Sequence, residues 1–249
     1  MHLAQIACLL FLGLAFDISH VHGDSAEVKI VSSGPCSDVI LKKKGVDPRK
    51  YKSKILFDPK KVTTIPAKPV VPGCFRIVAH NVTLTEKVTQ VTGEFEMRVS
   101  GNADPNKPIL QCKKRQPKCG CGEKDICMYC DFCKNFKKMV RDGRVNNKEI
   151  DVNSAPNSCD CNIPADTYTI DAEVCTPDEK ELGENVPTEV LSYVADGKDF
   201  SLFTTLYLYD FRFNSLANSD SSPAAREALK KRKAMGLAGC YVIGSNVSV

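Results

Sequence analysis

The chain has 249 residues, of which 43% are hydrophobic, and a formal net charge of +4 at pH 7. This length is sufficient for one well-cored domain, and we expect no nucleic-acid partner. Three of the four histidines stand at positions 2, 20 and 22, in an N-terminal segment that we predict to be removed, so only His80 remains. Most Ser-His-Asp and zinc chemistry is thereby excluded.

The first element is an apolar run from Leu3 to Phe16, which closes in "VHG" before Asp24. It has the length of a signal peptide, so we predict a secretory signal over residues 1–23 and a mature domain over residues 24–249. No later segment is long and apolar enough to span a bilayer. We therefore expect a soluble, exported product in which closely spaced cysteines form disulfides.

Two segments in the first half of the chain show the period-two pattern of half-buried antiparallel strands. In "CFRIVAHNVTL" (74–84), Phe75, Ile77 and Ala79 alternate with Arg76, Val78 and His80. In "GEFEMRVS" (93–100), Phe95, Met97 and Val99 alternate with Glu94, Glu96 and Arg98. We expect the first set on each strand to be buried and the second set to face solvent.

The segment "CGCGEKDICMYCDFC" (119–133) carries five cysteines. Ile126, Cys130, Cys133, Phe136 and Val140 follow one another at steps of three and four residues, which predicts a short amphipathic helix that holds several of these cysteines. A zinc site, a thioredoxin-type redox site and disulfides are the three interpretations. Export and the scarcity of histidine favour disulfides.

Three more strands are predicted toward the C-terminus. "DTYTIDAEV" (166–174) places Tyr168, Ile170 and Ala172 on one face, and "CYVIGSNVSV" (240–249) forms the last strand. "DFSLFTTLYLYDFRF" (199–213) is largely apolar on both faces. This pattern is typical of a central strand that is covered on both sides, and direct lining of a ligand site is the alternative.

Between the last two strands, "SSPAAREALKKRKAM" (221–235) predicts a helix with Ser222 as its cap and Pro223 in its first position. The basic cluster from Lys230 to Lys233 has three interpretations: a solvated helix end, a contact with anionic membrane lipid, or a site of proteolytic processing in secretion. The first is the simplest, because cations suit the C-terminal end of a helix dipole.

No recognisable catalytic motif is present, and we predict no catalytic residue, no metal and no cofactor. His80 lies in a strand-like segment beside the sequon Asn81-Val82-Thr83, which favours a half-exposed strand residue over a catalytic base. Asn81 and Asn246 are the predicted glycosylation sites. Asn246 is the less favourable acceptor, because it lies inside a predicted strand near the end of the chain.

Removal of Cys8 with the signal leaves twelve of the thirteen cysteines, an even number that permits complete pairing. Their order, with the strands between them, resembles the ML lipid-recognition domain family, and within it the ganglioside-activator (sphingolipid activator) branch. The matching pieces, in order, are "GPCSD", "VVPGCFRIVAHNVTL", "PILQC", "CMYCDFC", "CDCNIPADTYTI", "VPTEVLSYVADGKDFSLFTTLYLYD" and "GLAGCYVIGSNVSV".

The resemblance implies a β-cup, in which two antiparallel sheets surround an apolar cavity that the cysteine-rich helix closes near its rim. It also implies the bridges Cys36–Cys240, Cys112–Cys127 and Cys133–Cys161, and a fourth bridge from Cys159 to Cys119, Cys121 or Cys130. The chain departs from the family pattern at Cys74, at Cys175 and in an insertion over about residues 214–235.

The function that the resemblance implies is non-enzymatic. We expect a secreted or lysosomal protein that holds the acyl chains of a lipid or glycolipid, transfers them, and has a glycolipid hydrolase as a candidate partner. The alternative is a cystine-rich secreted protein-interaction module, an inhibitor or ligand, without a lipid cavity.

The candidate lipid-contact residues lie in a loop and in the strand that follows it. They are Val186, Val190, Leu191, Tyr193 and Val194 in the loop, and Phe200, Leu202 and Leu206 in the strand. The loop either touches a membrane surface transiently or is buried in the core, and both interpretations stay open. The basic runs Lys42–Lys44 and Lys113–Arg115 would assist at an anionic surface.

Overall fold

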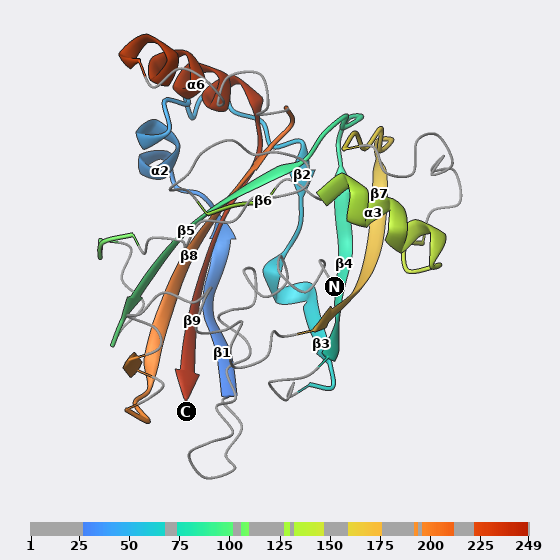
Figure 1. Cartoon of the computed structure of the whole chain (residues 1–249), viewed down its shortest axis with the longest axis vertical. Coiled ribbons are helices and arrows are strands. Elements are labelled where there is room, and N and C mark those ends of the chain that lie inside the picture. The colour runs from blue at the N-terminus through green and yellow to red at the C-terminus, as the bar shows by residue number, and fades with distance from the viewer. Residues whose placement is uncertain are drawn as a thin grey trace.

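The protein is mainly β and is built from two antiparallel sheets, as the sequence predicts (Figure 1). The computed structural model describes residues 27–67, 74–101, 106–109, 127–129, 132–146, 159–175, 192–193, 196–211 and 222–248. The elements in chain order are β1 (Glu27–Pro35), α2 (Asp38–Lys43), β2 (Ile55–Leu56), η1 (Pro59–Lys61), β3 (Val62–Ile65), β4 (Cys74–Leu84), β5 (Thr92–Ser100), β6 (Cys127–Tyr129), α3 (Phe132–Arg141), β7 (Asp166–Cys175), β8 (Phe200–Tyr209), α6 (Pro223–Gly236) and β9 (Leu237–Ser248).

The first sheet has the strand order β1-β9-β8-β5-β6, and we call it the β8 sheet. Strand β8 pairs with β9 on one side and with β5 on the other, and all of its residues are buried or half-buried. The prediction of a central strand covered on both sides is therefore confirmed. Its apolar residues on both faces are explained by this position, because neither face meets solvent.

Strand β5 differs from the prediction. Phe95 and Met97 are buried as expected, but Glu94 on the opposite face is only 3% exposed. The expectation of a half-exposed strand was wrong, because β5 lies beside β8 and shares the helical cover on the outer face of the sheet. The period-two pattern identified the faces correctly but could not show that the charged face is covered as well.

The second sheet, which we call the β4 sheet, is centred on β4. Strand β7 pairs along one edge of β4, while β2 and β3 share the other edge. In β4, Phe75 and Ile77 are buried whereas Arg76 and His80 are exposed, as the alternation predicts, but Val78, which was expected on the exposed face, is buried. A bulge between Ala79 and Val82 interrupts the ladder.

The two sheets meet at β2. The Tyr241 hydroxyl in β9 donates a hydrogen bond to the Ile55 carbonyl oxygen at 2.6 Å and accepts one from the Phe57 amide at 3.2 Å. The Lys54 amide also donates to the Ala238 carbonyl oxygen at 2.7 Å. Because β2 itself pairs with β4, this short segment ties the β8 sheet to the β4 sheet, and we call it the seam.

Asp210, directly after β8, contacts the connection between β4 and β5. Its carboxylate accepts hydrogen bonds from the Thr89 amide at 3.2 Å, the Thr89 hydroxyl at 3.2 Å and the Gln90 amide at 3.1 Å. The connection between β4 and β5 is thus held against the end of β8. Three donors on one carboxylate make this a charge-assisted contact, which is stronger than bonds between neutral groups.

Helix α3 packs against β7, and the Phe136 and Tyr168 rings meet edge to face with centroids 6.2 Å apart. The predicted helix is present but begins at Phe132, so of the cysteines described in this region it carries Cys133, while Cys127 lies in strand β6. The expectation that several cysteines share the helix was therefore wrong for Cys127. Cys130 lies outside the described residues.

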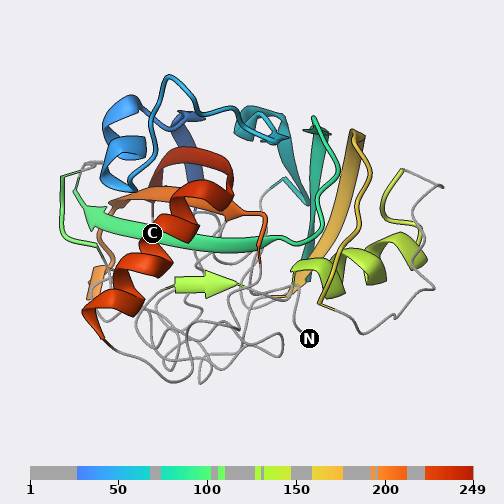
Figure 2. The ribbon, with the colours of Figure 1, turned by 90° about the horizontal axis from the view of Figure 1, so that it is seen from above.

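Helix α6 occupies the predicted C-terminal insertion, and together with α2 it covers the outer face of the β8 sheet at one end, as seen from above in Figure 2. Leu41 and Val46, in and just after α2, pack with Tyr207, Tyr209 and Leu237 in one apolar cluster. Leu229 and Ala234 of α6 are partly buried and pack against this cluster from outside.

Disulfides join distant parts of the chain. Cys36, just after β1, is bonded to Cys240 in β9, and Cys133 in α3 is bonded to Cys161, which are the pairings that the resemblance implies. Cys74 is also in a disulfide. In the ladder between β4 and β7 the backbone of Cys74 lies opposite that of Cys175.

Cys159 is in a disulfide too. Its candidate partners, Cys119, Cys121 and Cys130, lie outside the described residues, as does Cys112, the expected partner of Cys127. The bonded cysteines fit an oxidising compartment.

Candidate functional site

The candidate lipid-contact residues of β8 lie on the face of the β8 sheet that looks toward the β4 sheet. Leu206 is the cross-strand partner of Tyr241, which contacts the seam, and Phe200 and Leu202 share its face because side chains alternate along a strand. The neighbouring side chains on this inner face are Phe95, Met97, Ile243 and Val247. These seven apolar side chains are at most 9% exposed.

The β4 sheet also has an apolar inner face. Phe75 and Ile77 of β4 and Tyr168 of β7 are at most 5% exposed. On the other face of this sheet Arg76 and His80 are exposed and Arg76 forms an ion pair with Asp171, although Val78 on that face is buried. Each sheet thus has a buried apolar face; that of the β4 sheet includes Tyr168, which packs against Phe136 of α3, and the two sheets are joined at the seam.

The candidate loop meets this surface through Tyr193. The Tyr193 ring is half-buried, and its centroid lies 5.5 Å from that of Phe200 at the start of β8. The structure therefore brings the loop and the strand of the candidate site together at this point. Val186, Val190, Leu191 and Val194 lie outside the described residues.

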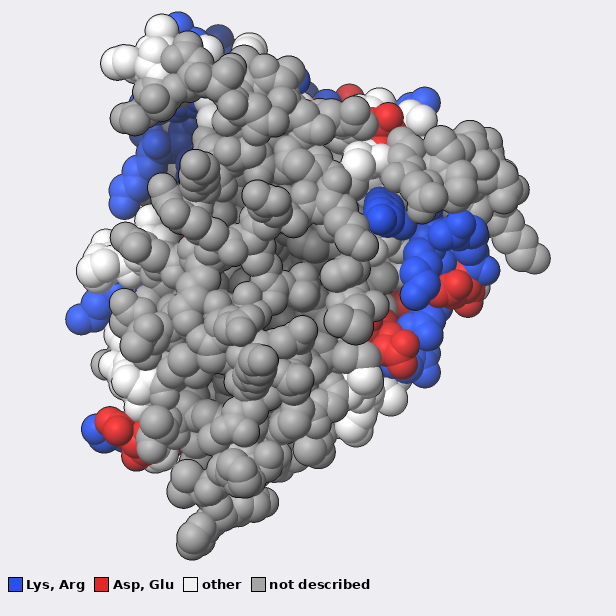
Figure 3. All heavy atoms as spheres, in the orientation of Figure 1, with Lys and Arg blue, Asp and Glu red and all other residues white. Residues whose placement is uncertain are grey.

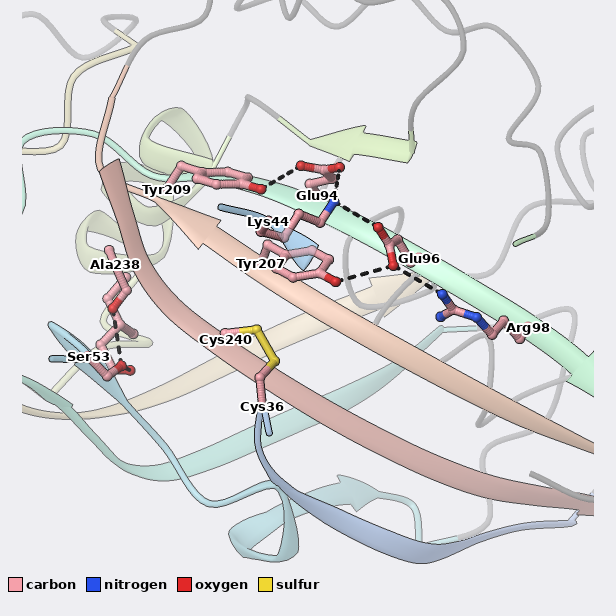
Figure 4. Close-up of a disulfide and its surroundings, with 11 residues drawn as sticks. Cys36, Lys44, Ser53, Glu94, Glu96, Arg98, Tyr207, Tyr209, Ala238 and Cys240 are labelled. Atoms are coloured by element: carbon pink, nitrogen blue, oxygen red, sulfur yellow. Dashed lines mark hydrogen bonds and ion pairs between the residues drawn. A yellow bond between two sulfur atoms is a disulfide. The ribbon is translucent and has the colours of Figure 1, made fainter. Parts of the chain in front are cut away.

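The outer face of the β8 sheet carries a cluster of charged residues that we call the ionic cluster (Figure 4). Lys44, just after α2, places its Nζ 2.8 Å from Glu94 Oε1 and 2.7 Å from Glu96 Oε1. Lys233 of α6 lies 3.5 Å from the second oxygen of Glu94. One strand of the sheet therefore holds the ends of two helices through two carboxylates.

Two tyrosines complete the ionic cluster from β8. The Tyr209 hydroxyl donates to Glu94 at 2.6 Å and the Tyr207 hydroxyl donates to Glu96 at 3.2 Å, while Lys44 lies 4.1 Å from the Tyr207 ring centre. Burial raises the pKa of both phenols, and the neighbouring carboxylates raise it further. Both tyrosines therefore remain neutral hydrogen-bond donors.

The carboxylate of Glu94 stays ionised although it is buried. Burial alone would raise its pKa, but the Lys44 and Lys233 ammonium groups and the hydrogen bonds from Lys44 and Tyr209 outweigh this, so the pKa lies below its usual range. Burial alone would likewise lower the pKa of Lys44, but Glu94 and Glu96 raise it above its ordinary value. The cluster is thus a set of mutually compensating charges.

We expect the stabilisation from the ionic cluster to be independent of pH near neutrality. The contribution of Glu94 is present above its unfolded pKa of about 4.3 and is lost as the pH falls through its lower folded pKa. That of Lys44 is present below its unfolded pKa of about 10.4 and is lost as the pH rises through its higher folded pKa.

Urea unfolding of the wild type and of Glu94→Gln as a function of pH would measure this. The stability difference between the two proteins should be constant from about pH 5 to 9 and should shrink below about pH 4. A difference that changes between pH 5 and 7 would contradict the charge states assigned to the cluster.

The basic cluster on α6 is divided by the structure. Lys230 and Lys231 are exposed, whereas the Lys233 side chain is only 12% exposed and pairs with Glu94. Arg232 lies 5.1 Å from the Phe211 ring centre. The interpretation as a solvated helix end was therefore wrong for Lys233, because the outer face of the β8 sheet supplies a buried partner for it.

Sequence reasoning missed the ionic cluster, since it assigned Glu94 and Glu96 to a solvent-exposed face. The sequence did predict that β8 is covered on both faces. Because β5 pairs with β8, it shares this cover, and its charged residues therefore need partners.

His80 is exposed on the outer face of the β4 sheet, and no group of metal-ligating side chains comes together within the described ranges. Asn81 is also exposed, at the bulge of β4, with a positive φ of 57°. Asn246 is exposed, but its side-chain oxygen accepts a hydrogen bond from Ser201 at 2.8 Å.

No protein-family model and no curated protein matches the chain. In the part of the chain that the structure describes, no helix has the length and apolarity needed to cross a membrane. The function is therefore inferred from the residues and geometry of the chain itself.

Proposed function

We propose that the protein binds the acyl chain of a lipid or glycolipid between its two sheets and transfers it between membranes without catalysis. The observation that supports this most directly is the buried apolar face of the β8 sheet on the side of the seam, where Phe200, Leu202 and Leu206 are all nearly inaccessible to solvent. The β4 sheet likewise buries Phe75 and Ile77, while Arg76 and His80 on its other face are exposed.

Elementary energetics fit a transfer role. Removal of an acyl chain from water gains about 0.8 kcal/mol per methylene, so a chain of about eighteen carbons gains on the order of 14 kcal/mol. A bilayer offers nearly the same gain. The free energy of the acyl chain therefore changes little when it moves between membrane and protein. No chemical step is needed, and the headgroup decides which lipid is favoured.

The proposal extends the resemblance to the ML family to this chain, with a secreted or lysosomal location and a glycolipid hydrolase as candidate partner. The signal-like N-terminal run and the disulfides support an oxidising compartment. The loop that includes Tyr193 is the proposed point of transient membrane contact, because Tyr193 lies directly against Phe200.

Native-state mass spectrometry and solvent extraction of the purified protein should recover a bound lipid, and a fluorescent lipid should move between vesicles in its presence. Recovery of no lipid, together with no transfer, would reject the proposal and favour a disulfide-rich protein-interaction module. Hydrolysis of lipid without an added hydrolase would also contradict it.

A single substitution can distinguish a lipid-binding cavity on the inner face from a solid core there. Thr204 lies on the inner face between Leu202 and Leu206 and is 7% exposed. If an acyl chain occupies this space, Thr204→Trp should fill it, lower lipid transfer and leave the fold stable. In a solid core the larger ring should instead cost about 1–3 kcal/mol of stability. Thr167→Trp, on the exposed face of β7, is the matched control.

A further inference from the structure

Helices α2 and α6 form a joint surface at one end of the β8 sheet, which we call the helical platform (Asp38–Lys43 and Pro223–Gly236). A Cβ atom at Gly45, just after α2, would lie 3.8 Å from the Ala234 Cβ and 3.9 Å from the Lys230 Cε. The C-terminal ends of the two helices therefore pack against each other. Figures 1 and 2 show both helices on the same side of the sheet.

The two helices share one surface pattern. Val39 is 62% exposed, and the exposed Lys42 and Lys43 follow it at three and four residues, on the same side of α2. Met235 is 81% exposed, and the exposed Lys231 precedes it by four residues on α6. Val39 and Met235 are the two most exposed large hydrophobic side chains among the described residues.

The outward lysines differ from the inward ones. Lys44 and Lys233 are held by Glu94 beneath the platform. Lys42, Lys43, Lys230 and Lys231 form no ion pair with any residue that the structure describes. Asp38 and Glu227 are the exposed acids on the described platform surface, so its charge is net positive. Figure 3 shows Lys and Arg side chains at the upper left edge, where α2 and α6 lie.

We propose that the helical platform docks on the surface of an anionic lipid bilayer. The four outward lysines contact the headgroups, and Val39 and Met235 enter the interfacial region. Each lysine near such a surface contributes about 1 kcal/mol at physiological ionic strength, and the apolar side chains add burial. This site is separate from the Tyr193 loop and does not depend on a ligand between the sheets.

Two simpler explanations account for only part of this pattern of exposed lysines beside exposed apolar side chains. The negative end of each helix dipole accounts for lysines near both C-terminal ends. It does not account for Val39 and Met235 standing exposed beside them. A sulfated polysaccharide would also bind the lysines, but it offers nothing to the apolar side chains, whereas a bilayer interface satisfies both.

The first test is binding to phosphatidylcholine vesicles with and without phosphatidylserine, at about 0.15 M salt. The wild type should bind the anionic vesicles and not the neutral ones. Replacement of Lys42, Lys43, Lys230 and Lys231 by glutamine should weaken this binding about 1000-fold. Lys60→Gln with Lys61→Gln removes an exposed pair on η1 and should leave the affinity within about twofold.

The second test uses the absence of tryptophan from the chain. Met235→Trp and Val39→Trp each introduce a single reporter, whose emission should shift to the blue with anionic vesicles. Ile65→Trp, at a position that is 49% exposed in β3, should not shift. Tyr193→Trp reports in the same way on membrane contact by the loop of the proposed lipid site. Failure of the platform to bind vesicles can therefore be distinguished from failure of the proposed lipid function.

Three results would overturn the proposal that the helical platform docks on a bilayer. They are unshifted emission at both platform positions, equal vesicle affinity of the four-lysine variant and the η1 control, and binding to a sulfated polysaccharide without binding to vesicles.

Discussion

Replacement of Glu94 by alanine is expected to lower the free energy of unfolding by about 3–5 kcal/mol. The variant removes the described carboxylate partner of Lys233, leaves Lys44 with Glu96 alone, and removes the acceptor of the Tyr209 hydroxyl. Urea unfolding at neutral pH, followed by circular dichroism, measures the loss. We expect α6 to be the first element to lose protection in amide hydrogen exchange, because Lys233 loses its described partner on the sheet.

Glu173→Ala is the matched control, because it removes an ion pair to Arg144 in which the Glu173 side chain is 51% exposed. Its effect should not exceed about 1 kcal/mol. A third variant replaces Lys44, Glu94 and Lys233 together by leucine or methionine, and it should recover much of the lost stability, because no buried charge is left alone. Equal losses in Glu94→Ala and the control would show that the ionic cluster is not structural.

Removal of the Cys36–Cys240 bridge by a double alanine substitution should cost about 3–5 kcal/mol. The two cysteines are 204 residues apart, so the bridge restricts the unfolded chain over most of its length. It also holds the start of α2 against β9, beside the Tyr207 and Tyr209 cluster. Urea unfolding of the oxidised variant measures the effect.

The Cys133–Cys161 bridge provides the comparison. Its two cysteines are only 28 residues apart in the sequence. Replacement of both by alanine should therefore cost about 2–4 kcal/mol, less than removal of the Cys36–Cys240 bridge. A larger loss at the short bridge would show that local packing around Cys133, which is fully buried, outweighs chain restriction.

The two faces of the β8 sheet serve different purposes. The inner face carries the apolar residues Phe200, Leu202 and Leu206 and supports the proposed lipid site. The outer face holds α2 and α6 through Lys44 and Lys233, and so sets the position of the lysines in the proposed platform. Strand β8 contributes to both faces because its side chains alternate, with Leu206 on the inner face and Tyr207 and Tyr209 in the ionic cluster on the outer face.

Much of this architecture could be predicted because it depends on local patterns. Alternation in residues 74–84 and 166–174 identified β4 and β7, and apolar residues on both faces identified β8 as central. Ser222 and Pro223 marked the beginning of α6. Of the candidate site, the sequence identified Phe200, Leu202 and Leu206, since these residues repeat with the period of the strand.

Other features depend on which elements become neighbours. Cys127 lies in a strand because β6 pairs with β5, although the spacing of Ile126 and Cys130 favoured a helix. The ionic cluster joins Lys44, Glu94 and Lys233, which are far apart in the chain and carry no shared motif. Local periodicity cannot report the cover that a distant helix supplies.

The fold class, the central strand and the apolar inner face follow from local sequence, because each is recorded in the period of neighbouring side chains. It is the folded chain that buries Glu94, turns Lys233 inward and Lys231 outward, and brings two helix ends together at Gly45. The physical reason is that the cost of burying a charge depends on its partners, and these partners come from segments that the chain brings together only when it folds.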